Sequence, residues 1–442
     1  MLKRKIERDL ILWRNSPIRK PLIIRGARQV GKTSVARNFA QKNFSQLIEI
    51  NLEKKSHRQM FDVTTSVDDF LQRVNVMFDK KIEDGQTLLF IDEIQQSQNI
   101  MDLLRFFAEE RPNLHVVATG SLLESRAKNM GAVPVGRVEY MYLYPLTFFE
   151  YLEAKGREKL NQELQEIALG ENLTDTKLAC ELFAEYLRIG GMPEVVANFV
   201  KRNDYSEVKE ILSRLRTAYF DDIAKYAKST SERKYLELVI EYAPKIAGGL
   251  FKYENFGGSS YRSREIGEAV GTIEKVRLLS QIKAVNSISL PLMYKTKRPK
   301  KMIWLDVGMV NESNNLIKEM MMGTYQGRVM EQITGQILIA GGTRQLMELG
   351  YWSRNRDEGS AEVDFCFQLG EKMVGMEVKS GSTQEMKSLF SMIDSSEGKV
   401  IPIRVSWSNL GKEKYHFNGK EYNILSLPFY LLERWENLLK FA

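Results

Sequence analysis

Apolar and polar residues alternate along residues 21–144 in blocks that have the lengths of strands and helices. Short apolar runs bounded by turn or cap residues are typical of buried parallel strands. Four such runs are PLIIR, QLIEIN, TLLFID and LHVVAT. The segments between them carry apolar residues three and four positions apart, as amphipathic helices do. This βαβ pattern predicts a parallel sheet covered by helices.

The pattern changes twice further along the chain. Residues 146–285 are mostly helical in pattern, and the two glycines and Met-Pro at 190–193 predict a helix end. The string SREIGEAVGTIEKVRLLSQIKAV continues the helical spacing, although Gly271 weakens it. From about residue 324, a helix, three strands, a helix and a further strand follow one another. This last order predicts a second compact unit, distinct from the first.

Length and composition narrow the class of protein. A chain of 442 residues has room for two to four domains, at roughly 100–200 residues each. Hydrophobic residues make up 43% and charged residues 27%, which excludes a disordered or collagen-like chain. Two cysteines and three scattered histidines disfavour a disulfide framework, a cysteine zinc site and histidine-centred catalysis. We expect a cytoplasmic protein without membrane contact, because no apolar run approaches ~18 residues and no signal-peptide pattern is present.

Basic residues are concentrated in two places. The net charge is 64 − 57 = +7, which permits nucleic-acid binding without establishing it. Eleven Lys and Arg residues against two acidic ones lie in residues 1–40. A second cluster lies between two apolar strand-like runs and consists of Lys295, Lys297, Arg298, Lys300 and Lys301. Each cluster is either a solvated surface or a phosphate-contacting one. In the second case residues 288–306 form a basic hairpin.

Residues 26–33, GARQVGKT, match the pattern G-x-x-x-x-G-K-[ST] of a phosphate-binding loop. The match follows a predicted strand and begins a predicted helix, where glycines and the helix N-terminus surround phosphate oxygens with N–H groups. Lys32 is then placed to reach the β- and γ-phosphates, and the Thr33 hydroxyl to ligate Mg²⁺. The residues predicted to contact the nucleotide are Gly26, Ala27, Arg28, Gln29, Val30, Gly31, Lys32, Thr33, Ser34 and Asp92.

The string LLFIDEIQ supplies the acidic partners of that loop. Asp92 and Glu93 end a predicted buried strand at the edge where α/β sheets bind ligands. Such a pair can be a solvated strand end, but beside a phosphate loop it suits Mg²⁺ binding by Asp92. Glu93 is then the general base that polarises the attacking water.

Two further residues are candidates for the same chemistry. Ser121, preferred to Thr119, ends the next strand and could orient the water, unless it belongs to an ordinary Gly-Ser turn. Arg137 precedes the strand EYMYLYP and could stabilise transition-state charge as an arginine finger, in cis or from a neighbouring subunit. A surface arginine is the alternative.

These motifs, in this order, resemble the bacterial and archaeal AAA-type ATPases that carry a conserved C-terminal domain of unknown function. The strings YPLTFFEYL, GGMPEVV, WLDVGMV and AEVDF…MEVKSG extend the resemblance over nearly the whole chain. The resemblance implies an ATP-hydrolysing core and a C-terminal nuclease-like fold, in a family discussed with defence and DNA-associated systems. In many relatives a winged-helix segment joins the two parts. The string SREIGEAVGTIEKVRLLSQIKAV lacks the tight turn between two helices that such a segment has.

A second candidate site lies in the C-terminal unit. Strand alternation places Asp364 on one face of its strand, and Glu377 and Lys379 together on one face of the next. Two carboxylates suit Mg²⁺ or Mn²⁺, and a lysine can activate water or contact a phosphate. With Glu331 from the preceding helix, this set resembles the PD-(D/E)xK nuclease signature. Alternatively, Glu377 and Lys379 form an exposed pair on a scaffold.

The predicted fold class is α/β, in three parts. Residues 1–150 form a P-loop NTPase parallel-sheet core, 151–322 a helical middle region with a winged-helix-like form as one alternative, and 323–442 an α/β PD-(D/E)xK nuclease-like domain. The favoured function is Mg²⁺-dependent ATP hydrolysis coupled to a nuclease-like domain that acts on nucleic acid, DNA before RNA. The alternatives are an ATP-driven switch that binds DNA or a protein without cleavage, and a protein that binds ATP without hydrolysing it.

Overall fold

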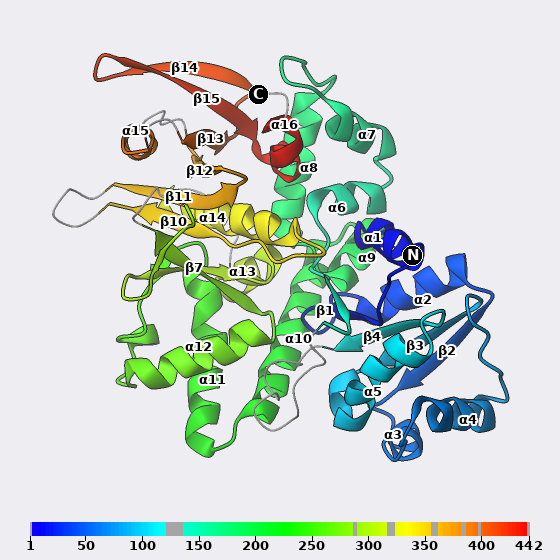
Figure 1. Cartoon of the computed structure of the whole chain (residues 1–442). Helices are drawn as coiled ribbons and strands as arrows, with labels where there is room; N and C mark the ends of the chain where they lie inside the picture. The colour runs from blue at the N-terminus through cyan, green and yellow to red at the C-terminus, as the bar shows by residue number, and fades with distance from the viewer. Residues whose placement is uncertain are drawn as a thin grey trace.

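The computed structural model describes residues 2–120, 136–285, 290–315, 323–354, 361–381, 386–396 and 399–439. Figure 1 shows a sheet on each side of a column of helices. The N-terminal sheet and its helices form one side, and the C-terminal sheet forms the other. The helices of the middle region run between them and contact both.

The N-terminal sheet is fully parallel, with the strand order β2-β3-β4-β1-β5. Its strands are β1 (Leu22–Arg25), β2 (Gln46–Asn51), β3 (Thr87–Asp92), β4 (His115–Gly120) and β5 (Glu139–Tyr142). Its helices are α1 (Ile6–Arg14), α2 (Lys32–Asn43), α3 (Lys55–Phe61), α4 (Val67–Phe78) and α5 (Gln98–Glu110), with the short η1 (Ile94–Gln96). The four predicted strands are confirmed.

Alternation along β3 explains why this sheet is covered on both faces. Leu88 and Phe90 face one hydrophobic core, whereas Leu89 and Ile91 face a second core on the opposite side. Every residue of β3 and β4 is buried. A strand that is buried on both faces carries a continuous apolar run, and such a run was the signal in the sequence.

The middle region begins with six helices and a short 3₁₀ turn. These are α6 (Phe148–Ala154), α7 (Glu158–Glu166), α8 (Thr176–Ile189), α9 (Pro193–Arg202), α10 (Tyr205–Ile223), η2 (Ala224–Tyr226) and α11 (Thr230–Ile246). The predicted helix end at 190–193 is confirmed, and its glycines have a packing reason. A Cβ on Gly190 would lie 2.1 Å from Asp306 Oδ1, and one on Gly191 would lie 2.0 Å from Leu146 O.

The last part of the middle region differs from its predicted form. It contains β6 (Leu250–Phe251), η3 (Phe256–Gly258), α12 (Ser263–Lys275), β7 (Leu279–Val285), β8 (Tyr294–Lys295), β9 (Lys300–Trp304) and α13 (Val307–Ser313). The helical pattern of residues 263–285, whose continuity the sequence left open, extends through Gly271 but only as far as Lys275, and Arg277 takes a left-handed φ of 65°. The chain then continues as β7.

The basic cluster lies on the arm that returns along β7. β8 and β9 both pair antiparallel with β7. Lys295 ends β8, Lys300 and Lys301 begin β9, and Lys297 and Arg298 lie in the turn between these two strands. Lys301 is buried at 1% exposure, so its expected place on a basic surface is wrong. The other four cations of the cluster, Lys295, Lys297, Arg298 and Lys300, are at least partly exposed.

The second sheet crosses the expected boundary between residues 322 and 323. Its order is β14-β15-β13-β12-β11-β10-β7-β9-β6, with β8 also on β7. The C-terminal elements are α14 (Gly323–Ala340), β10 (Gly350–Ser353), β11 (Glu362–Leu369), β12 (Lys372–Val378), α15 (Lys387–Asp394), β13 (Val400–Ser406), β14 (Gly411–Phe417), β15 (Lys420–Pro428), η6 (Phe429–Arg434) and α16 (Trp435–Leu439). The predicted order of a helix, three strands, a helix and a strand is confirmed.

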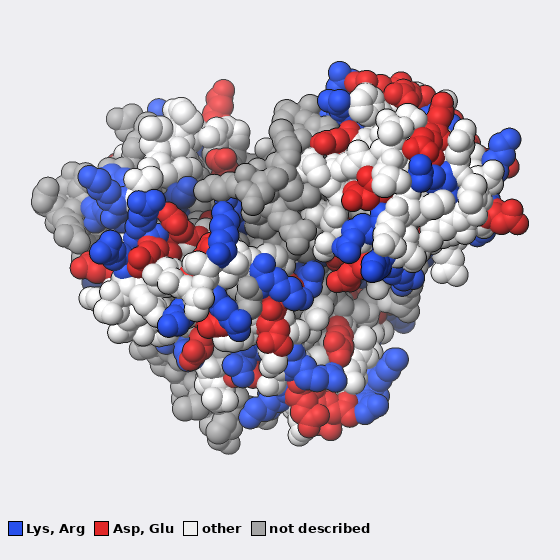
Figure 2. Space-filling view, turned by 90° about the horizontal axis from the view of Figure 1, so that it is seen from below, with Lys and Arg blue, Asp and Glu red and all other residues white. Residues whose placement is uncertain are grey.

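Charged side chains of both signs are spread over the face of the molecule that lies at the bottom in Figure 1. Figure 2 shows basic and acidic side chains interspersed over most of this face. The net charge of +7 is therefore not gathered there into one broad basic field. Within the described residues, no helix is long and apolar enough to cross a membrane.

Candidate functional site

The phosphate loop has the backbone form that its glycines predict. Gly31 has a φ of 97° and Gln29 a φ of 64°, which turns the chain so that α2 begins at Lys32. A Cβ on Gly26 would lie 2.3 Å from Leu143 O, so the chain after β5 packs directly on the start of the loop. Larger residues at these two glycines would displace the loop.

Lys32 lies inside the loop and is held by backbone groups. Its Nζ donates to Gly26 O at 3.0 Å and to Ala27 O at 2.7 Å, and the residue is 6% exposed. Burial lowers the pKa of Lys32 to about 8, although the carboxylates of Glu93 and Asp92 oppose this shift. A buried ammonium that only carbonyls contact is suited to bind an anion that enters the loop.

The acidic pair lies beside Thr33, as predicted. Thr33 Oγ1 donates to Asp92 Oδ2 at 2.9 Å, and the Thr119 hydroxyl donates to Asp92 Oδ1. Glu93 follows directly, with a φ of 55°, and its carboxylate accepts a hydrogen bond from Gln95. The structure thus brings together a hydroxyl and two carboxylates at the carboxyl end of β3. Such a set fits Mg²⁺, which takes one or two carboxylates along with phosphates and water.

Side chains from outside the loop hold its backbone. Tyr219 on α10 donates its hydroxyl to Arg28 O at 2.6 Å, and Asp222 pairs with Arg28 Nη1 at 2.7 Å. From the other side, Arg4 donates to Val30 O at 2.9 Å and pairs with Glu150 at 3.1 Å. The loop is therefore fixed to the middle region as well as to its own sheet.

The remaining predicted residues lie elsewhere. Ser34 is exposed in the first turn of α2, and Ser121 lies outside the described residues. Arg137 pairs with Glu109 at 2.6 Å and is about half exposed. It stands where β5 begins, and β5 runs parallel to β1, so Arg137 is at the end of the sheet opposite the phosphate loop.

The C-terminal residues do come together, but around a lysine that was not part of the prediction. Lys301 Nζ donates to Glu331 Oε2 at 2.5 Å and to Asp364 Oδ1 at 3.2 Å. Lys379 Nζ donates to Glu377 Oε1 at 2.8 Å. Burial, followed by the Asp364 carboxylate, raises the pKa of both Glu331 and Glu377 to about 8.

The donor set of this cluster does not fit a divalent metal as it is arranged. Within the described part of the chain, no three His, Cys, Asp or Glu side chains form a group that could hold a metal ion. An ammonium is a hydrogen-bond donor only and cannot serve as a ligand. Lys301 occupies the space where Glu331 and Asp364 converge, so the prediction of a metal site at Glu331, Asp364 and Glu377 lacks support.

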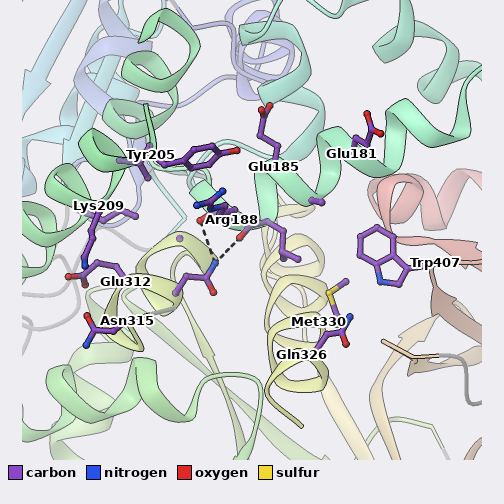
Figure 3. Close-up of a pocket in the computed structure, with 16 residues that line it drawn as sticks. Glu181, Glu185, Arg188, Tyr205, Lys209, Glu312, Asn315, Gln326, Met330 and Trp407 are labelled. Atoms are coloured by element: carbon purple, nitrogen blue, oxygen red, sulfur yellow. Dashed lines mark hydrogen bonds between the residues drawn. The ribbon is translucent and has the colours of Figure 1, made fainter. Parts of the chain in front are cut away.

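A cavity lined by none of the residues of the two clusters lies between the middle region and the C-terminal unit. Its volume is about 730 Å³, and it is lined by α8, α10, α13, α14 and Trp407. Figure 3 shows the Arg188 side chain beside the Tyr205 ring and Trp407 on the far side next to Met330. The Arg188 guanidinium carbon lies 3.6 Å from the centroid of the Tyr205 ring. The cavity therefore separates the first half of α10 from the C-terminal unit.

The prediction from sequence missed the residues that reach these clusters from distant elements. Arg4, Tyr219, Asp222 and Lys301 lie far along the chain from the groups that they contact. The sequence carries a weak signal for the burial of one of them, Lys301. Lys301 stands before the apolar run MIWLD, where the period of two predicts a buried side for alternate residues.

Comparisons with known proteins support the assignment of the phosphate loop to a nucleotide-binding domain. A family model described as an AAA domain matches residues 18–152. Two models described only as domains of unknown function, DUF8612 and DUF4143, match residues 180–319 and 326–430. The N-terminal unit is thus an AAA-type P-loop ATPase domain, and its parallel sheet is the core expected of one.

Similarities that extend beyond the N-terminal unit are more distant. The uncharacterized protein MJ1637 of Methanocaldococcus jannaschii is 23% identical over 352 residues, which cover 75% of this chain and 70% of that protein. The RuvB Holliday junction branch migration motor of Thermotoga maritima is 15% identical with a TM-score of 0.30, over 67% of this chain and 93% of that one. The Hsp104–ADP complex of Saccharomyces cerevisiae is 17% identical with a TM-score of 0.28, over 63% of this chain and 38% of that one.

Proposed function

We propose that the chain hydrolyses ATP with Mg²⁺ and uses the nucleotide state to reposition its C-terminal half. The observation that carries the proposal is the hydrogen bond of 2.9 Å between Thr33 and Asp92, with Glu93 as the next residue. Lys32 would contact the β- and γ-phosphates, while Thr33 and Asp92 would hold the Mg²⁺ that assists phosphoryl transfer. Glu93 would accept the proton of the attacking water.

A glutamine substitution tests the role of Glu93. In Glu93→Gln we expect phosphate release to fall about 10²–10³-fold, because the amide cannot accept the proton. Binding of a fluorescent ATP analogue should remain. The matched control is Glu110→Gln, which changes an exposed carboxylate at the far end of α5. Equal phosphate release by wild type and Glu93→Gln would show that Glu93 is not the general base. ATP binding without phosphate release by either protein would show that the chain binds ATP without hydrolysing it.

We propose that α10 carries the nucleotide state to the rest of the molecule. Tyr219 and Asp222 hold the phosphate loop at one end of this 19-residue helix. Tyr205 and Lys209 line the cavity next to the C-terminal unit at the other end. A helix of this length spans about 28 Å, so a shift of the loop by nucleotide would be passed across the middle region. Arg137 could serve only the loop of a second subunit, because it stands at the opposite end of its own sheet.

Nucleic acid is the partner that we propose for the C-terminal half, DNA before RNA, with a protein partner as the alternative. Residues 279–304 contain six Lys and Arg residues and no Asp or Glu. Lys301 is buried, but Lys283 and Lys297 are exposed. Cations on a strand and its turn can contact phosphates without reading bases.

Salt dependence tests this surface. We expect the logarithm of the DNA association constant to fall linearly with the logarithm of salt concentration. Lys297→Ala should reduce that slope by about one, because one phosphate contact is lost. Lys177→Ala, an exposed lysine on α8, is the control. No salt-dependent binding to duplex DNA, single strands or RNA would favour a protein partner. Cleavage of a phosphodiester by Asp364, Glu377 and Lys379 stays a prediction, and no step is assigned to them.

A further inference from the structure

The Lys301 ammonium is surrounded by three oxygen acceptors. Its Nζ lies 2.5 Å from Glu331 Oε2 and 3.2 Å from both Asp364 Oδ1 and Asp364 O. A lysine ammonium has three N–H donors, so the three acceptors match its full capacity. The Phe365 ring, with its centroid 5.0 Å from Nζ, covers the ammonium further. The point where these oxygens converge is therefore a cation position.

The lysine reaches this position from outside the C-terminal unit. Lys301 belongs to β9, which pairs with β7, whereas Glu331 and Asp364 belong to α14 and β11. The Lys301 side chain is 1% exposed, against 23% for Glu331 and 14% for Asp364. The cation is thus the innermost group of the cluster. The carboxylates close over it.

The second carboxylate pair leaves one oxygen without a partner. Glu377 is 8% exposed at its side chain, and Lys379 contacts only its Oε1. Glu377 Oε2 is buried and has no hydrogen-bond partner among the described residues. Asp364 Oδ2 accepts from the Val378 N–H at 2.8 Å, which ties Asp364 to the strand that carries Glu377. A buried carboxyl oxygen that no donor contacts leaves a place for a proton or a cation at this point of the cluster.

We propose that Lys301 is the resident cation of this cluster, and that its ammonium excludes a divalent cation from the oxygens of Glu331, Asp364 and Glu377. The ammonium is tethered to β9, so it joins the middle region to the C-terminal unit at the position where a nuclease-like site would bind Mg²⁺ or Mn²⁺. Loss of Lys301 would expose a site for a hard divalent cation, because such ions prefer several carboxylate and carbonyl oxygens. The proposal does not depend on ATP hydrolysis.

Manganese titration of the nucleotide-free full-length chain tests the proposal. Four proteins are compared by calorimetry: wild type, Asp364→Asn, Lys301→Ala and the double variant. Metal bound weakly near Thr33 and Asp92 is common to all four and cancels. We expect wild type and Asp364→Asn to be indistinguishable. Lys301→Ala should gain one equivalent of Mn²⁺, and the added Asp364→Asn should remove it.

Two outcomes overturn the proposal. Uptake of Mn²⁺ by wild type that Asp364→Asn abolishes would show that Lys301 does not exclude metal. A folded Lys301→Ala protein that gains no Mn²⁺ would show that the oxygens are not a cation site. Lys301→Met, whose unbranched chain fills the same space, replaces the alanine variant if the latter fails to fold. Lys301→Arg, which keeps the charge, and Lys300→Ala on the same strand should both titrate like wild type.

Discussion

Two buried lysines, one in each half of the chain, have opposite surroundings. Lys32 in the phosphate loop is 6% exposed and donates only to the backbone carbonyls of Gly26 and Ala27. Lys301 in β9 is 1% exposed and donates to the carboxylates of Glu331 and Asp364. Burial lowers the pKa of Lys32 to about 8. Burial also acts on Lys301, but the Asp364 and Glu331 carboxylates outweigh it and raise its pKa above the ordinary value.

The difference separates a site that can accept a ligand from one that is already filled. A buried cation without a counter-ion gains much from an anion that enters, since both charges are then compensated away from water. A buried cation between two carboxylates is already compensated, so an entering anion would stabilise it little. The first arrangement supports phosphate binding, and the second supports cohesion between two parts of the fold. The presence of acidic and basic residues in the sequence does not distinguish the two arrangements.

The largest expected effect is the loss of activity on removal of the first lysine. Lys32→Met should lower phosphate release from ATP by about 10²–10³-fold, because a positive group aimed at developing charge is lost. Lys42→Met, at the exposed end of the same helix, is the matched control and should retain activity. A steady-state phosphate-release assay measures both. Equal activity in Lys32→Met and wild type would show that Lys32 does not contribute to ATP hydrolysis.

Removal of the second lysine should affect stability. Lys301→Met removes the cation from Glu331 and Asp364, whose side chains are 23% and 14% exposed, and breaking a pair that is largely buried costs up to about 3–5 kcal/mol. Chemical denaturation followed by circular dichroism would detect the loss as a lower midpoint for the C-terminal half. Lys300→Met, the half-buried neighbour on β9, should lose less. Equal losses in the two variants would mean that the carboxylates contribute nothing to the position of Lys301.

The next largest effect is on the pH dependence of ATP binding, which should reflect the lowered pKa of Lys32. The nucleotide-free protein loses the Lys32 charge as the pH rises through about 8, whereas bound phosphates favour the charged form. The dissociation constant for ATP should therefore increase above pH 8 by up to about tenfold per pH unit. Below pH 8 it should be flat with respect to this group. Fluorescence anisotropy with a labelled ATP analogue measures the profile, and an identical rise in Lys32→Met would assign it to another group.

The smallest effect concerns the contact between α10 and the phosphate loop. Asp222→Asn removes the charge that pairs with Arg28 at 2.7 Å, and a contact of this kind contributes about 0.5–1.5 kcal/mol. We expect a several-fold weaker affinity for ATP. Asp221→Asn, an exposed carboxylate next in sequence on the same helix, is the control. Affinity that is unchanged in Asp222→Asn would indicate that α10 does not position the loop.

Much of the N-terminal unit could be predicted from sequence because its signals are local. The four strands of residues 21–120, the phosphate loop and the position of Asp92 all follow from short apolar runs and one motif. Strand parallelism then brings Thr33 and Asp92 together without knowledge of distant contacts. Arg137 was harder to place, because its position at the far end of β5 depends on how that strand pairs.

Long-range pairing explains what the sequence did not reveal. Residues 279–285 have helical spacing of apolar residues, yet they form β7 because β9 and β10 flank them. A tertiary partner overrides local propensity in such a segment. In the sequence, Lys301 is one cation of a basic run. Its place inside the cluster depends on the pairing of β9 with β7 and on its contact with Glu331 of α14. Neither contact has a signal within a few residues of Lys301.

Crystals grown with Mn²⁺ and a non-hydrolysable ATP analogue would test the contrast between the two lysines most directly. Anomalous scattering locates manganese without reference to activity. We predict a manganese peak beside Thr33 and Asp92, with the Lys32 ammonium on the phosphates, and no peak between Glu331 and Asp364. A manganese peak between Glu331 and Asp364, with Lys301 displaced, would contradict the account, as would nucleotide bound without contact to Lys32.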